Sequence, residues 1–64
     1  MFGEYEIVRS LAQVGKKVTS GTRGVIVMVY PAEPPGYEVE FFDEAGNTLA
    51  VETVDEKQIE RWPA

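Results

Sequence analysis

The sequence contains no cysteine and no histidine among its 64 residues. The absence of cysteine excludes disulfide bonds and thiolate metal ligands, and the absence of histidine removes the commonest zinc ligand. Small domains often depend on such links because a short chain buries only a small core. We therefore expect no metal and no cofactor, and stability that comes from an economical core or from association. A chain without cysteine suits a reducing compartment, so we expect a cytoplasmic protein.

Positive charge is also scarce, since six basic residues face eleven acidic residues and the net charge is −5. Proteins that bind a phosphate backbone normally carry a basic face, because neutralising phosphates supplies much of the affinity. This balance predicts that nucleic acid is not a partner. The longest apolar run, residues 25–30, falls far short of the roughly 20 residues that cross a bilayer. The first residues lack the features of a signal peptide, so we expect no membrane contact either.

Short runs of β-forming residues are present instead, separated by turn residues about every eight to twelve positions. The clearest run alternates Tyr37, Val39 and Phe41 with Glu38 and Glu40. This alternation predicts a strand with the three apolar side chains in the core and the two carboxylates outside, because a slip of one residue would bury both charges. Five strands are expected, at residues 5–11, 25–30, 37–41, 48–54 and 59–62.

The connections between these runs favour one fold. Residues 13–24 read as a long polar loop that ends in a tight turn at 21–24, and the proline-rich residues 31–36 form a second loop. Residues 43–47 predict a hairpin turn, and residues 55–58 a single 3-10 or helical turn before the last strand. The prediction is an all-β domain, a small five-stranded SH3-like barrel over residues 1–64. An OB-fold, the main alternative, needs a longer helix than this chain has room for.

Residues 21–27, which read Gly-Thr-Arg-Gly-Val-Ile-Val, and the strand at 37–41 resemble a family of small bacterial proteins. That family, frequent in cyanobacteria, is catalogued as a domain of unknown function. The Gly-x-x-Gly-x-Val pattern is also similar to that of KOW-type and other SH3-like barrels. The resemblance implies a stand-alone barrel that acts as an accessory, antitoxin-like or immunity-like partner of another protein. It implies no catalytic residues.

The candidate partner-binding residues are Met28, Tyr30 and Trp62, which we expect to cluster on one side of the molecule. Residues 25–30 are apolar at every position, so this strand either bends around the core or leaves one face exposed. We expect Ile26 in the core, and Met28 and Tyr30 either there or at an interface. Trp62 either covers one end of the core or grips a partner. Gly24 is expected to need a positive φ or a close approach of the backbone.

Two clusters of charged residues are interpreted as solvent-exposed surface and not as functional sites. Glu38 and Glu40, with Glu52 across the hairpin, predict a solvated acidic face in preference to a partner patch or a cation site. Lys16, Lys17 and Arg23 form the basic cluster of the chain. We interpret this cluster as a solvated loop, with weak contact to RNA as the alternative.

No combination of residues predicts catalysis, because histidine and cysteine are missing and no serine stands in a nucleophile motif. The sequence favours a non-enzymatic protein-interaction module, an accessory or antitoxin-like protein that binds another protein or a second copy of itself. The alternative is a KOW-like nucleic-acid or ribonucleoprotein accessory domain. A basic face around the first loop would favour the alternative, whereas an acidic surface around an apolar strip favours protein binding.

Overall fold

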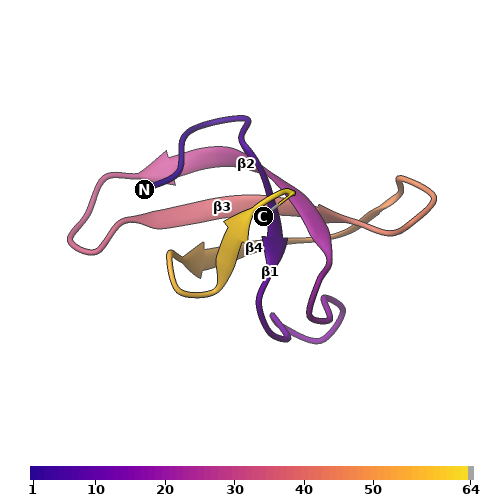
Figure 1. The fold of residues 1–64 in the computed structure, drawn as a ribbon. Helices are drawn as coiled ribbons and strands as arrows, with labels where there is room; N and C mark the ends of the chain where they lie inside the picture. Colours follow the sequence, from indigo (N-terminus) through magenta and orange to yellow (C-terminus); the bar gives the residue numbers. More distant parts are fainter. Residues whose placement is uncertain (64) are drawn as a thin grey trace.

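The computed structural model describes residues 1–63 and places five strands in one antiparallel sheet. The strands are β1 (Ile7–Ser10), β2 (Arg23–Tyr30), β3 (Gly36–Phe42), β4 (Thr48–Asp55) and β5 (Ile59–Arg61). Their order in the sheet is β4-β3-β2-β1-β5, so that the first and last strands of the chain pair with each other. Figure 1 shows β1 crossing β3 at a steep angle, as the strongly bent sheet folds over its own core. The predicted all-β, SH3-like arrangement is confirmed.

The connection between β4 and β5 differs from the prediction. Residues 55–58 form one hydrogen-bonded turn, in which the Gln58 N–H donates to the Asp55 carbonyl at 3.2 Å, and the described residues 1–63 contain no helix. One of the two side-chain bonds of a capping box forms, since the Gln58 amide oxygen accepts from the Asp55 N–H at 2.9 Å. The Asp55 carboxylate accepts from the Lys57 N–H at 2.9 Å, one residue short of the position that a capping box uses. The helical turn is absent because Ile59 must already be extended to pair with Ser10 in β1. No helix among residues 1–63 has the length and hydropathy needed to span a membrane.

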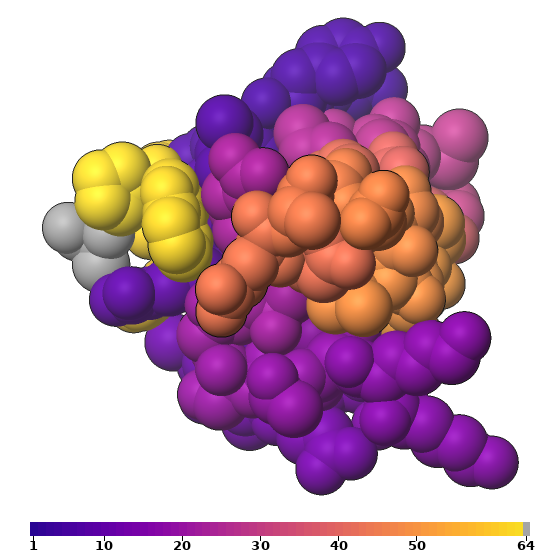
Figure 2. Space-filling model, turned by 90° about the vertical axis from the view of Figure 1, so that its right-hand side faces the viewer, coloured from indigo at the N-terminus to yellow at the C-terminus, as the bar shows by residue number. Residues whose placement is uncertain are grey.

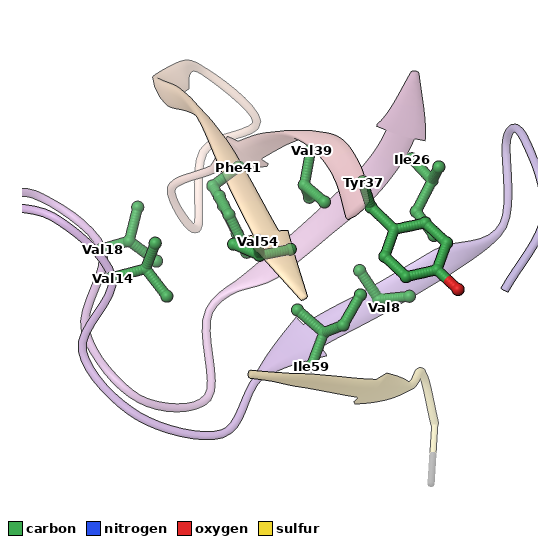
Figure 3. Packing of buried hydrophobic residues seen from close by; sticks show 9 residues of the cluster. All are labelled: Val8, Val14, Val18, Ile26, Tyr37, Val39, Phe41, Val54 and Ile59. Atoms are coloured by element: carbon green, nitrogen blue, oxygen red, sulfur yellow. The ribbon is translucent and has the colours of Figure 1, made fainter. Parts of the chain in front are cut away.

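The core lies on one side of β3, where Tyr37, Val39 and Phe41 are fully buried. Glu38 and Glu40 lie on the other side and remain partly exposed, so the predicted alternation is confirmed. Buried hydrophobic residues from every strand and from the long loop complete the cluster in Figure 3, namely Val8, Val14, Val18, Ile26, Tyr37, Val39, Phe41, Val54 and Ile59.

β2 is apolar at every position after Gly24, and a β-bulge within it changes which positions face the core. The pairing with β3 shifts register between Ile26 and Met28, which leaves Val27 without a partner. Before the bulge Ile26 is fully buried, as predicted, whereas after it Val29 packs against the core. Met28 and Tyr30 consequently face solvent. The bulge thus lets one strand fill the core from two sets of alternating positions.

Gly24 lies inside β2, not in a turn, and a turn at residues 20–21 precedes the strand. Its φ is not positive, but β3 approaches it closely. A Cβ at this position would lie 2.7 Å from Val39 Cγ1 and 2.9 Å from Phe41 Cδ1. The predicted close approach of the backbone at Gly24 is therefore confirmed. The predicted tight turn at residues 21–24 is wrong in its bounds, because the turn ends at residue 21 and the strand begins at residue 23.

The long loop between β1 and β2 is not the purely polar segment that the sequence suggested. Val14 and Val18 form an isolated β-bridge and are both buried, so the loop contributes directly to the core. Ser10, at the end of β1, is hydrogen-bonded to the end of the same loop. Its hydroxyl donates to the Thr19 carbonyl at 2.7 Å and accepts from the Thr22 N–H at 3.0 Å. The spacing of the two valines around the turn at residues 15–17 is the signal that sequence reasoning missed.

Candidate interaction surface

The three strands β2, β3 and β4 present a continuous face away from the core. Residues paired across antiparallel strands share a face. Met28 pairs with Glu38, and Glu38 with Thr53. In the next row Tyr30 pairs with Gly36, and Gly36 with Asp55. We use the term outer face for the side chains that the pairing places there: Val25, Met28, Tyr30, Glu38, Glu40, Val51, Thr53 and Asp55.

Three large apolar side chains of the outer face are exposed. Met28 is 49% exposed, Tyr30 41% and Val51 50%. Met28 and Tyr30 are therefore surface residues and not core residues. Val51 was not singled out from the sequence. Val51 can be assigned to the outer face only when its pairing with Glu40 of β3 is known.

Carboxylates surround these apolar side chains. Glu38 accepts a hydrogen bond of 2.6 Å from the Thr53 hydroxyl, and Glu40 accepts one of 2.6 Å from the Thr48 hydroxyl. Glu52 does not join them, contrary to the prediction, because it pairs with Val39 and so lies on the opposite face. Its carboxylate lies next to Gly15 of the long loop. Within residues 1–63 no group of three or more acidic side chains is arranged to hold a metal ion.

Trp62 is 42% exposed but lies in a different place from Met28 and Tyr30. The Trp62 backbone N–H donates to the Ile7 carbonyl of β1 at 3.0 Å. The residue lines an open groove of about 660 Å³ whose walls are the end of the long loop and the base of the β3–β4 hairpin: Thr19, Ser20, Gly21, Thr22, Arg23, Phe42, Asp43, Glu44, Leu49 and Trp62. Figure 2 looks onto this side, with the yellow C-terminal residues beside the orange hairpin and the purple loop below.

In the order of the strands, Trp62 lies apart from the other two candidate residues. The sheet order puts β5 next to β1, so Trp62 adjoins Ile7, whereas Met28 and Tyr30 occupy the end of β2 that pairs with the start of β3. Neither Met28 nor Tyr30 lines the groove that contains Trp62. The structure brings Met28 and Tyr30 together and separates Trp62 from them.

The three basic residues of the first loop also separate. Lys16 and Lys17 occupy the exposed turn between Val14 and Val18. Arg23 begins β2, and its guanidinium lies 5.8 Å from the centre of the Phe42 ring, a cation–π contact. Arg23 and Phe42 form the wall between the large groove and a smaller one of about 270 Å³.

The shifted titratable groups serve the fold. Burial raises the pKa of Tyr37, whose hydroxyl donates to Glu56 at 2.7 Å and accepts from the Phe2 N–H at 3.1 Å. The hydrogen bond from Tyr37 is the main cause that lowers the pKa of Glu56. The Asn47 N–H, with further N–H groups of the hairpin turn, lowers the pKa of Asp43. Each of these groups is held by hydrogen bonds of the folded chain.

The fold and its surfaces define a small SH3-like β domain with an apolar outer face bordered by carboxylates. A model of the family described as a domain of unknown function (DUF4926) matches residues 4–61. The chain therefore belongs to this family, and the match includes all five strands. A comparison with curated proteins gave no match.

Proposed function

We propose that this chain is a non-enzymatic protein-interaction module of the cytoplasm, and that its outer face binds another protein. The observation that carries the proposal is the exposure of Met28, Tyr30 and Val51 on one face, with Glu38, Glu40 and Asp55 between and around them. Methionine and tyrosine are enriched at protein interfaces, where a few large side chains are surrounded by polar residues. In this role the chain is an accessory or antitoxin-like partner.

A partner on the outer face would remove apolar area from water. Fully burying a large apolar side chain contributes roughly 1.5–3 kcal/mol relative to leaving it exposed. Met28 and Tyr30 are each close to half exposed, so covering them would recover about half of that amount for each. Met28 also adapts its shape to a partner, because its side chain is unbranched and polarisable. The carboxylate border favours a partner with positive charge and opposes one with negative charge.

The test is a double substitution that removes the apolar area without touching the core. Met28→Glu with Tyr30→Ser should abolish capture of the partner from a lysate of the source organism, while circular dichroism shows an intact β-domain. The matched control is Leu11→Glu with Tyr5→Ser, which alters two other exposed apolar residues, and it should capture the partner as well as the unaltered protein. Equal loss in both variants, or no loss in the first, would contradict the proposal.

A further inference from the structure

β4 ends the sheet on one side, and its outer hydrogen-bonding edge is open. In the order β4-β3-β2-β1-β5 its neighbour is β3 alone. Among the described residues 1–63, the backbone hydrogen bonds of residues 48–54 run to β3 and not to any loop or turn. A strand of 8 residues with an open edge is a template for another extended chain. β5, the strand at the other end, has only 3 residues.

The carboxylates beside this edge lack basic partners within the chain. Glu38 and Glu40 lie one strand in, and Glu52 and Asp55 lie on β4 itself. No ion pair of the described part of the chain includes any of the four. Arg9 and Arg61, by contrast, pair with Glu60 and Glu6. The β4 edge therefore has two features side by side: backbone groups without a neighbouring strand, and carboxylates that form no ion pair within residues 1–63.

A second copy of the chain is a poor occupant of this edge. Two β4 strands paired with each other would bring two such sets of carboxylates together, and like charges on neighbouring strands destabilise a sheet. The net charge of −5 on each copy adds long-range repulsion. Nucleic acid is repelled in the same way. A basic extended peptide has the opposite charge and supplies the backbone groups that the edge lacks.

We propose that β4 receives a basic extended segment of the partner protein as a sixth strand, an inference that rests on the function proposed above. The added strand would lie about 4.8 Å from β4, with alternate side chains on the outer face. A lysine or arginine opposite Val51 or Thr53 is long enough to cross β4 and reach Glu40 or Glu38, while its stem covers Val51. The segment is thus recognised by a basic residue at every second position.

A synthetic heptapeptide in which lysine alternates with threonine serves as the probe, and its binding is followed by fluorescence anisotropy. The control peptide has the same sequence but carries N-methyl groups at two consecutive central residues. This change keeps the charge and blocks both hydrogen-bonding edges of the peptide. We expect the first peptide to bind and the second to lose binding. We also expect amide hydrogen exchange, measured by NMR on the protein, to slow in β4 when the first peptide binds.

The protein variants test the charge contribution. Glu38→Gln with Glu40→Gln should weaken binding of the probe about fivefold, since exposed ion pairs contribute modestly. Glu4→Gln with Glu44→Gln removes the same charge from other exposed positions and should leave the affinity unchanged. Equal binding of the two peptides, or binding without slower exchange in β4, would overturn the inference, as would a dimer whose β4 amides are protected without peptide.

The two proposals fail separately. If Met28→Glu with Tyr30→Ser abolishes capture of the partner but the lysine peptide leaves β4 unprotected, the outer face binds protein and the added strand is wrong. If neither result is obtained, both proposals are wrong.

Discussion

At the scale of single residues, Gly24 sets how closely β2 approaches β3. A Cβ there would meet the side chains of Val39 and Phe41 and, at 3.0 Å, the carbonyl oxygen of Glu40. Both side chains are fully buried and cannot move toward solvent. We expect Gly24→Ala to lower the free energy of unfolding by about 1–3 kcal/mol, because overpacking forces neighbours out of position. Urea denaturation measures this loss.

Gly3 provides the control for that experiment, since a Cβ at Gly3 would meet nothing within 4 Å and its φ is not positive. Gly3→Ala should leave the free energy of unfolding nearly unchanged. An equal effect of the two substitutions would show that general glycine entropy, and not the contact with β3, governs the site.

The Glu56 carboxylate makes the stability of the folded chain depend on pH. Its pKa in the folded chain lies below its ordinary value of 4.5, mainly because the Tyr37 hydroxyl donates to it. The stabilisation is therefore present above pH 4.5 and is lost as the pH falls through the lowered pKa. We expect Glu56→Gln to reduce the slope of melting temperature against pH on the acid side. The lowered pKa of Asp43 leaves a residual slope of the same sign.

The comparison variant is Glu4→Gln, which removes one carboxylate from the exposed N-terminal segment and should retain the full acid slope. On the alkaline side, the raised pKa of Tyr37 preserves stability up to pH 10.0 and reduces it as the pH rises further. An acid slope that is unchanged in Glu56→Gln would show that this hydrogen bond does not couple folding to protons.

At the scale of structural elements, the long loop between β1 and β2 belongs to the core. Val18 is fully buried, whereas Val51 of β4 is 50% exposed. The same substitution at both positions isolates the effect of burial. Val18→Ser should cost about 2 kcal/mol or more of unfolding free energy, and Val51→Ser should stay within about 0.5 kcal/mol of the unaltered protein. Chemical denaturation distinguishes the two, and comparable losses would mean that the loop packs only loosely.

The elements also show what the sequence can and cannot predict. Alternation along residues 37–41 predicted which side of β3 is buried, because the side-chain period of a strand is two. In β2 every position after Gly24 is apolar, so alternation carries no information there. The bulge at Val27, which decides that Met28 is outside and Val29 inside, depends on pairing with β3. The helical turn at residues 55–58 was predicted from local capping residues, but the pairing of Ile59 with Ser10 prevented it.

At the scale of the whole molecule, the regular spacing of strands and turns was enough to predict one all-β domain of five antiparallel strands. It was not enough to predict which surface residues lie together. Trp62 separates from Met28 because β5 crosses back to pair with β1, a contact between the two ends of the chain. Such long-range pairings leave no local pattern. The outer face, including Val51, becomes visible only when the order and register of the strands are known.

The central claim is that the outer face of β2, β3 and β4 binds another protein. Replacing Tyr30 with the photoreactive amino acid p-benzoylphenylalanine in the source organism tests it most directly, with the same replacement at the exposed Tyr5 as comparison. Irradiation should join the chain to a different protein from position 30 and give no such product from position 5. A product from position 5 alone, or only a product with nucleic acid or with a second copy of the chain, would contradict the claim.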